Sequence, residues 1–240
     1  KKIELLFTIG EELYVKGSDV FDYSKIEAKQ AYVLDLSGAV GAAARRAPSI
    51  ISVRAEIKGK AAHAGFEPER GIHAIAVAAE AVTRLSMGHV DEDTTFNIGT
   101  INGGTATNIV PDRCVVTGEI RSYDHSKALE YVKSTEKIFA EEADKAEATA
   151  EVTHQVHLVA YETPVESRTV KDFLKACEKT GLPGTLTETF GGSDNNSFAK
   201  HGIEGLVLSC GMYQAHSTNE YTKIKDLYDG AVLIRTLIEL

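Results

Sequence analysis

The chain has 240 residues, of which 43% are hydrophobic and 25% charged, with 26 basic against 35 acidic side chains and a formal net charge of −9. This composition is typical of a globular protein with a sizeable core, in one large or two small domains. The acidic balance argues against binding to nucleic acid or to an anionic membrane, and we expect neither partner.

Targeting and redox features are sparse in the sequence. No apolar run approaches the ~20 residues that span a bilayer, and the Lys1-Lys2 start leads into no signal-like segment. Three widely spaced cysteines, Cys114, Cys177 and Cys210, form no Cys-x-x-Cys pair, which predicts free, buried thiols. We therefore expect a cytoplasmic protein.

Two short strands that end in acidic side chains are predicted in the first 48 residues. Residues 3–9 are apolar and are expected to form a buried strand that leads into Glu11 and Glu12. Residues 20–29 are polar, with one short helix at most, and the apolar run 31–34 ends at Asp35. Open α/β sheets bind their ligands at the carboxyl ends of the strands, so we expect a site there.

The middle of the chain is predicted to alternate strands and helices in the order β-α-β-β-α-β. Strands are expected at residues 50–58, 94–101, 114–120 and 148–161, and helices at 71–85 and 126–145. This order is typical of a ferredoxin-like unit. We expect a separate domain at residues 49–164, inserted between two pieces of an α/β domain made of residues 1–48 and 165–240.

The last third of the chain returns to the α/β pattern. Helices are predicted at residues 169–180, 194–199 and 224–240, and strands at 186–190 and 205–210. His216 follows the second of these strands, as Asp35 and the glutamate pair follow the earlier apolar runs.

Glu11, Glu12, Asp35 and His216 are therefore candidates for one sheet edge. Two carboxylates and one imidazole are suitable ligands for zinc or a similar divalent ion. The remaining glutamate would be free to act as general base on a metal-activated water. The alternative is a set of surface acids and an ordinary histidine, because a chain with 35 acidic residues offers many such groupings.

Six segments occur in an order that identifies a family. They are Phe7-Thr8-Ile9-Gly10-Glu11-Glu12, Tyr32-Val33-Leu34-Asp35, Ala62-His63-Ala64-Gly65 with Pro68-Glu69-Arg70-Gly71, Gly103 to Asp112, Glu119-Ile120-Arg121-Ser122 and Gly191-Gly192-Ser193-Asp194. Together they resemble the M20 family of metallopeptidases, nearest to its peptidase T-like branch, from about residue 3 to residue 240. The resemblance implies a hydrolase-like catalytic α/β domain that carries the inserted ferredoxin-like lid.

The resemblance also implies roles for single residues. Glu11 matches the general base, while Glu12, Asp35 and His216 match metal ligands. His63 matches a lid histidine that reaches the partner subunit's site and supports the oxyanion in family dimers. Taken alone, His63 would more often be a surface histidine.

Four further positions match residues that lie near the substrate in the family. Asn108 and Arg121 match lid positions that contact substrate, Arg121 through a carboxylate, which a guanidinium binds in a bidentate manner. Gly191 and Gly192 match a loop beside the substrate, where backbone N–H groups at the following helix could receive an anionic terminus. Arg121 could equally be an ion-pair partner and Asn108 a turn residue. The remaining six histidines are interpreted as structural or solvated.

The implied function is a zinc-dependent aminopeptidase or tripeptidase that hydrolyses short peptides as a homodimer. The family site holds two zinc ions per subunit, with cobalt or manganese as alternatives. Its first histidine and bridging aspartate come from a His-x-Asp segment ahead of the glutamate pair, which we expect to be missing here. We therefore expect an incomplete, inactive fragment of the enzyme. The alternatives are a non-catalytic dimerisation module and an amidohydrolase for N-acyl or N-carbamoyl amino acids.

Overall fold

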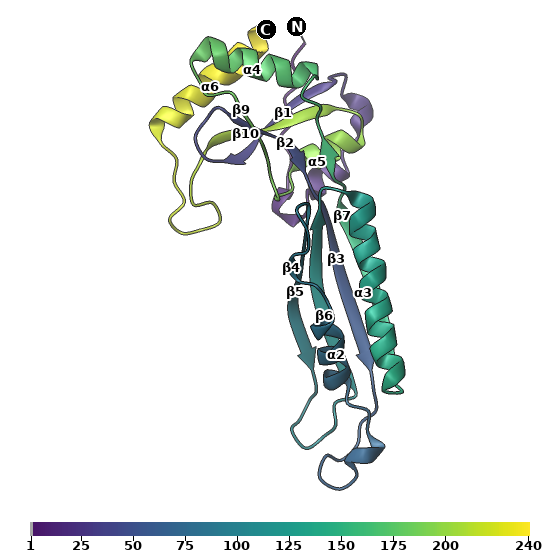
Figure 1. The fold of residues 1–240 in the computed structure, drawn as a ribbon. Coiled ribbons are helices and arrows are strands. Elements are labelled where there is room, and N and C mark those ends of the chain that lie inside the picture. The colour runs from purple at the N-terminus through teal and green to yellow at the C-terminus, as the bar shows by residue number, and fades with distance from the viewer. Residues whose placement is uncertain (1) are drawn as a thin grey trace. The chain divides into compact units, whose positions relative to one another are not determined.

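The computed structural model describes residues 2–240 and contains two compact units. Unit 1 consists of Lys1–Pro48 and Leu158–Leu240, and unit 2 of Ser49–His157. The chain thus returns to unit 1 at residue 158, where the sequence suggested 165. Both units are mixed α/β structures (Figure 1), which confirms the expected fold class.

Unit 2 is a five-stranded sheet covered by two helices. Its sheet order is β4-β5-β6-β3-β7, and the β3–β6 and β5–β6 pairs are antiparallel. Its strands are β3 (Ser49–Lys58), β4 (Gly88–His89), β5 (Thr94–Gly103), β6 (Arg113–Ser122) and β7 (Thr149–Leu158), and its helices are α2 (Ala74–Thr83), α3 (His125–Lys145) and the 3-10 turn η3 (Pro68–Arg70). Apart from the short β4, this is the predicted ferredoxin-like arrangement.

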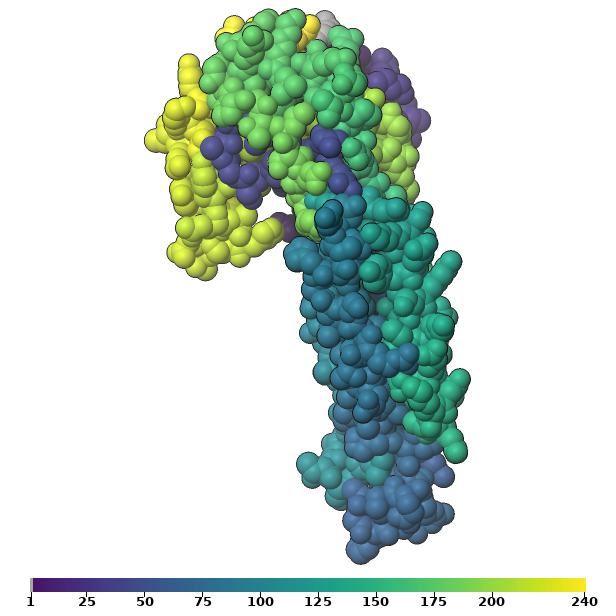
Figure 2. Space-filling view, viewed as in Figure 1, coloured from purple at the N-terminus to yellow at the C-terminus, as the bar shows by residue number. Residues whose placement is uncertain are grey.

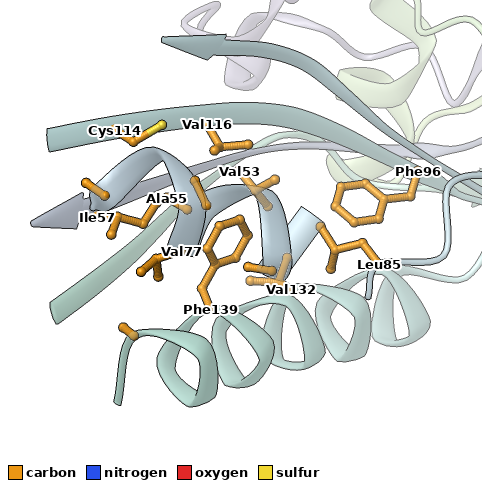
Figure 3. Packing of buried hydrophobic residues seen from close by; sticks show 14 of the residues in the cluster. Val53, Ala55, Ile57, Val77, Leu85, Phe96, Cys114, Val116, Val132 and Phe139 are labelled. Carbon is orange, nitrogen blue, oxygen red and sulfur yellow. The ribbon is translucent and has the colours of Figure 1, made fainter. Parts of the chain in front are cut away.

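One face of the unit 2 sheet carries the core and the other is polar. Val53 and Ile57 of β3 pack with Phe96, Val77 of α2 and Phe139 of α3 (Figure 3). Because side chains alternate along a strand, the residues between these core positions face the opposite side. That side carries ion pairs, such as Glu56 with both Arg54 and Arg113.

Unit 1 contains a mixed sheet flanked by helices. Strand β10 pairs in parallel with β1 and antiparallel with β2, and β2 also pairs with β8 and β9. The strands are β1 (Gln30–Ser37), β2 (Ala42–Ala47), β8 (Tyr161–Glu162), β9 (Thr185–Glu188) and β10 (Glu204–Met212). The helices are α1 (Lys16–Asp19), α4 (Arg168–Thr180), α5 (Asp194–Lys200) and α6 (Ile224–Glu239), with 3-10 turns η1 (Glu11–Leu13) and η2 (Tyr23–Lys25).

The core of unit 1 joins its central strand to two surface helices. Phe173 of α4 and Leu233 of α6 are buried against Leu206 and Leu208 of β10. Figure 2 shows α4 in green and α6 in yellow on the surface of this unit. In residues 2–240, no helix is long and apolar enough to cross a membrane.

The predicted strand over residues 3–9 is wrong. The segment forms no regular structure and pairs with no strand of the described chain, and the side chains of Leu5, Phe7 and Ile9 are 78–87% exposed. A strand needs a ladder partner for its backbone groups, and here side chains hold the segment instead. The carboxylate of Glu4 accepts the N–H groups of Glu27 and Ala28.

The three cysteines are free thiols, as predicted. Cys114 and Cys177 are buried, whereas Cys210 is only partly buried.

Gly205, at the start of β10, is expected to tolerate no side chain. A Cβ atom there would lie 1.6 Å from Oδ1 of Asn195, which is completely buried in α5 and cannot move aside. Gly205→Ala should therefore lower the free energy of unfolding by about 1–3 kcal/mol, measured by urea denaturation. Gly230→Ala in α6 is the matched control, because its Cβ would meet only Val40 at 3.8 Å. That variant should gain about 0.5–1 kcal/mol, and equal effects of the two changes would contradict the packing argument.

Candidate functional site

A strained turn presents the two glutamates. Gly10, which precedes η1, has a φ of 66°. Tyr14 and Val15, the two residues that follow η1, also have positive φ angles, of 59° and 52°. Positive φ is unfavourable for a β-branched residue and costs about 1–3 kcal/mol. Val15 offsets this by burial, at 1% exposure, and its N–H donates to the carbonyl of Glu11 at 2.7 Å. The backbone around the pair is therefore fixed locally.

Asp35 lies at a β-bulge rather than beyond the end of a strand. Leu34 pairs with Leu208 and Leu36 with Ser209, so Asp35 is the extra residue between two consecutive partners. Such a bulge turns a side chain out of the regular alternation and is common beside functional sites. The Asp35 carboxylate lies close enough to Asp194 and Glu12 for their charges to raise its pKa. Nothing in the sequence had indicated the bulge.

His216 lies in the long loop between β10 and α6 (Figure 1). Tyr213 and Tyr221 close this loop by exchanging two backbone hydrogen bonds of 3.1 Å, and their rings stack with centroids 5.0 Å apart. His216 has a φ of 63°, and its N–H donates to the carboxylate of Glu220. Its Nδ1 lies 3.6 Å from Oε1 of Glu12, and both side chains are 73% exposed.

The predicted acids converge closely enough to influence one another's ionisation. Burial, followed by the charges of Asp35, Glu12 and Asp194, raises the pKa of Glu11 to about 7. Burial, followed by the charges of Asp194 and Glu12, raises the pKa of Asp35 to about 6. The positive form of His216 opposes both shifts. Glu11, Glu12, Asp35 and His216 thus form one electrostatic cluster in unit 1.

Asp194 is a fifth member of this cluster, and sequence reasoning assigned it no role. It is the first residue of α5 and is only 8% exposed. Its Oδ2 accepts a hydrogen bond of 2.5 Å from Oγ1 of Thr8, while its Oδ1 is buried without a hydrogen-bond partner. The segment Gly191-Gly192-Ser193-Asp194 had indicated a functional loop, which was the available signal.

The donor set fits a divalent cation in kind, but the predicted ligands are not gathered around one point. Two carboxylates and an imidazole are ordinary zinc ligands, and the unpartnered Oδ1 of Asp194 is a further acceptor. However, among residues 2–240 no three His, Cys, Asp or Glu side chains form a group that could hold a metal ion. Among the described residues, Glu12 and His216 are the predicted ligands that approach one another within ion-pair distance.

A His-x-Asp triplet does occur in this chain, but not ahead of the glutamate pair. His89-Val90-Asp91 has this form, but it belongs to β4 and the following turn of unit 2. Its aspartate is engaged locally, because Asp91 pairs with Lys127 at 2.9 Å and accepts the N–H of Asp93. The triplet is thus part of a turn, and no His-x-Asp precedes Glu11 within these 240 residues.

The glycine loop before α5 offers fewer backbone donors than expected. The N–H of Gly191 donates to Oγ1 of Thr189 at 3.0 Å. Ser193 and Asn196 form a reciprocal capping box at the start of α5, and this helix has only seven residues. The N–H of Gly191 is therefore engaged within the loop, and a contact of Gly191 and Gly192 with substrate stays a prediction.

Unit 2 brings two predicted residues together, His63 and Asn108. A bridge joins His63 to Ile109, and the N–H of Ala64 donates to the carbonyl of Asn108 at 3.0 Å. Nδ1 of His63 accepts the N–H of Gly65 at 3.1 Å, so the neutral ring carries its proton on Nε2. Both predicted residues are exposed.

Arg121 lies at the opposite end of unit 2. It pairs in register with Ile50, next to the junction with unit 1, whereas the loop of Asn108 leads into the other end of β6. Arg121 lies eight positions after Arg113 along β6, which is about 26 Å at ~3.3 Å per residue. The Arg121 guanidinium donates to Glu119 at 2.6 Å. The structure therefore does not bring Arg121 together with His63 and Asn108 within one chain.

Comparison with known proteins gives consistent relatives. A family model described as the peptidase dimerisation domain of the M20 family matches residues 47–147. The uncharacterized protein YqjE of Bacillus subtilis strain 168 is 39% identical over 237 residues, which cover 99% of this chain and 64% of that protein. The crystal structures of aminopeptidase PepT from Bacillus cereus and a tripeptidase from Staphylococcus aureus superpose with TM-scores of 0.92 and 0.93, at 37% and 34% identity. Each alignment covers 97% of this chain and 62% of the other.

The fold and the matched dimerisation domain define a two-unit α/β protein of the peptidase and hydrolase class. The chain resembles the M20 peptidase family, as the sequence motifs predicted, and within that family its structure is PepT-like. It spans less than two thirds of the length of these relatives.

Removal of the Glu11 charge should stabilise unit 1. Burial and neighbouring charges disfavour its ionised form, so in metal-free buffer at pH 8 Glu11→Gln should gain about 1 kcal/mol after allowance for solvent screening. This corresponds to a rise of ~2–4 °C in melting temperature. The folded pKa lies above the usual 4.5, so the gain should shrink as the pH falls towards 5.

Glu4→Gln is the matched control for this experiment. The carboxylate of Glu4 accepts two backbone N–H groups, which lower its pKa. Loss of that charge should lower the melting temperature at pH 8. A rise for Glu4→Gln, or a fall for Glu11→Gln, would contradict the electrostatic description of the site.

Proposed function

We propose that the protein carrying these residues is a metal-dependent aminopeptidase of the tripeptidase type that hydrolyses short peptides as a homodimer. The observation that carries the proposal is the acid cluster of unit 1 in a PepT-like fold. Within it, Glu11 is the half-buried acid whose pKa is raised to about 7. A general base is most effective when its pKa lies near the working pH.

Glu11 is the proposed general base. It removes a proton from the water that attacks the scissile carbonyl, and it then delivers this proton to the leaving amine. The positive φ angles that follow η1 support this role, because they fix the backbone on which the carboxylate is mounted. Its neighbour Glu12 points to His216 instead, which leaves Glu11 available for proton transfer.

Glu12, Asp35 and His216 are the proposed metal ligands, with zinc as the proposed metal and two ions in the complete site. The metal, when bound, would lower the pKa of the attacking water and polarise the substrate carbonyl. Support comes from the donor chemistry, the 3.6 Å approach of Glu12 to His216 and the raised pKa of Asp35, which a nearby cation would relieve. Because the described residues form no three-membered metal group, the remaining ligands are proposed to lie outside them.

His63 is proposed to stabilise the oxyanion in the active site of the partner subunit. Its Nδ1 is occupied by the Gly65 N–H, so its Nε2–H is the available donor. The separation of His63 and Arg121 along unit 2 supports the need for two chains. If Arg121 serves the site of its own subunit, the His63 and Asn108 that complete that site are supplied by the other subunit.

The dimer is proposed to form through unit 2. The matched family model is a dimerisation domain, and β7 is a ten-residue edge strand of its sheet. Edge strands can pair across a two-fold axis. Asn108, Arg121 and the Gly191-Gly192 loop are the proposed substrate contacts, and Arg121 would bind the peptide carboxylate in place of its present partner Glu119.

A non-catalytic dimerisation module is the second candidate. The observation that favours it is the lack of a three-residue metal group within residues 2–240. In that case the full gene product would dimerise but bind no divalent ion with micromolar affinity. Calorimetric titration with Zn²⁺ separates the two candidates, because the peptidase should bind it tightly.

Glu11→Gln should abolish peptide hydrolysis and leave metal binding largely intact. In the full gene product we expect kcat for a tripeptide to fall by about 10²–10⁴-fold, because Gln cannot accept the proton. Glu12→Gln, which removes a proposed ligand, should lose both activity and Zn²⁺ affinity. Hydrolysis that survives Glu11→Gln would remove this residue from the mechanism.

A mixture of two inactive variants tests the exchange between subunits. Glu11→Gln and His63→Ala homodimers should each be inactive, but after subunit exchange half of the dimers are mixed and each has one intact site. Activity should then recover to about a quarter of the unmodified level. No recovery, with exchange verified by mass spectrometry of differently tagged subunits, would place His63 in its own subunit's site or outside catalysis.

A further inference from the structure

Asp194 is a buried carboxylate that the roles assigned above leave without a function. It is 8% exposed and is neither a proposed ligand nor the proposed base. In the described chain its one hydrogen bond comes from the neutral hydroxyl of Thr8, and no ion pair to a basic side chain is formed. Burial of an ionised carboxylate is costly unless an opposite charge or several donors compensate it. The residue therefore lacks a positive partner in a place where it needs one.

Two observations indicate where that partner would lie. Thr8 donates to Oδ2, and the other oxygen, Oδ1, is buried without a hydrogen-bond partner and is left to accept one. The negative charge of Asp194 contributes to the raised pKa values of Glu11, Asp35 and Tyr23. All of these groups belong to unit 1. A cation received by the acid cluster would thus also lie close to Asp194.

We propose that Asp194 is an additional acidic residue of the cation site, and that Thr8 holds its carboxylate in the orientation that strengthens cation binding. Asp194 acts as a positioning residue with a buried charge: it increases the attraction of the site for a divalent cation without taking part in proton transfer. Thr8 links this charge to the segment that carries Glu11, since only two residues separate them. The inference rests on the proposed cation site.

The test uses Asp194→Asn in the full gene product, with Zn²⁺ affinity measured by calorimetry and melting temperature measured in chelator and in saturating Zn²⁺. Mutation of groups that surround the metal ligands without binding the metal typically lowers metal affinity by about 10–100-fold. We expect a loss of Zn²⁺ affinity in this range. In chelator the variant should melt above the unmodified protein, because repulsion of Glu11 and Asp35 is relieved. In Zn²⁺ the order should reverse.

Two further variants make the result specific. Thr8→Val keeps the side-chain shape and removes the hydroxyl donor, so Zn²⁺ affinity should fall several-fold and the melting temperature in chelator should also fall. Asp22→Asn is the charge-matched control in unit 1, because Asp22 is an exposed cap of η2 and asparagine can also cap. It should leave Zn²⁺ affinity unchanged.

The outcomes distinguish this inference from the proposed function. Unchanged Zn²⁺ affinity in Asp194→Asn, with tight binding by the unmodified protein, would overturn the role of Asp194 and leave the proposed function standing. A lower melting temperature of that variant in both chelator and Zn²⁺ would assign Asp194 a purely structural role. Failure of the unmodified protein to bind Zn²⁺ would refute the cation site itself, and the inference with it.

Discussion

The candidate site depends on one constraint: several carboxylates must stay close together although their charges repel one another. Two unit charges 4 Å apart interact by about 4 kcal/mol at an effective dielectric constant of 20, a large fraction of the 5–15 kcal/mol by which domains are stable. The raised pKa values of Glu11 and Asp35 reflect this repulsion together with burial. Local backbone features hold the acids in place: positive φ angles beside η1 and a bulge in β1. The hydrogen bond from Thr8 restrains Asp194 in the same way.

Periodicity in the sequence predicted most elements, and it failed where a partner or a bulge decides the structure. Unit 2 was predicted nearly element by element, because its strands alternate and its helices are amphipathic. Strand β2 escaped prediction because Ala42–Ala47 is rich in alanine, which favours helices. Residues 3–9 have the composition of a strand, but a strand forms only against a neighbour. Motif order identified the candidate acids, whereas the buried charge of Asp194 became visible only when burial and hydrogen bonds were known.

In unit 2, the length of strand β6 keeps Arg121 far from Asn108 and His63. β6 keeps Arg121 beside the junction with unit 1 and carries the loop of Asn108 at its far end. Backbone hydrogen bonds then fix His63 to that same loop. A sheet of ten-residue strands is stiff along its length, so these two groups cannot approach one another by a small adjustment. An extended domain of this kind can join distant groups only by serving two sites, and a symmetric dimer supplies two sites.

The difference between Glu11 and Glu12 follows from the geometry of the turn that carries them. A 3-10 turn has three residues per turn, so consecutive side chains point about 120° apart. Glu11 is therefore half-buried among the other acids, while Glu12 is 73% exposed and faces His216. Desolvation above all raises the pKa of Glu11 to about 7. A strand would also direct adjacent side chains apart, but to opposite faces of a sheet. In the 3-10 turn the two carboxylates still influence one another, since the Glu12 charge contributes to the raised pKa of Glu11, and in the proposed mechanism Glu12 binds the metal while Glu11 moves a proton.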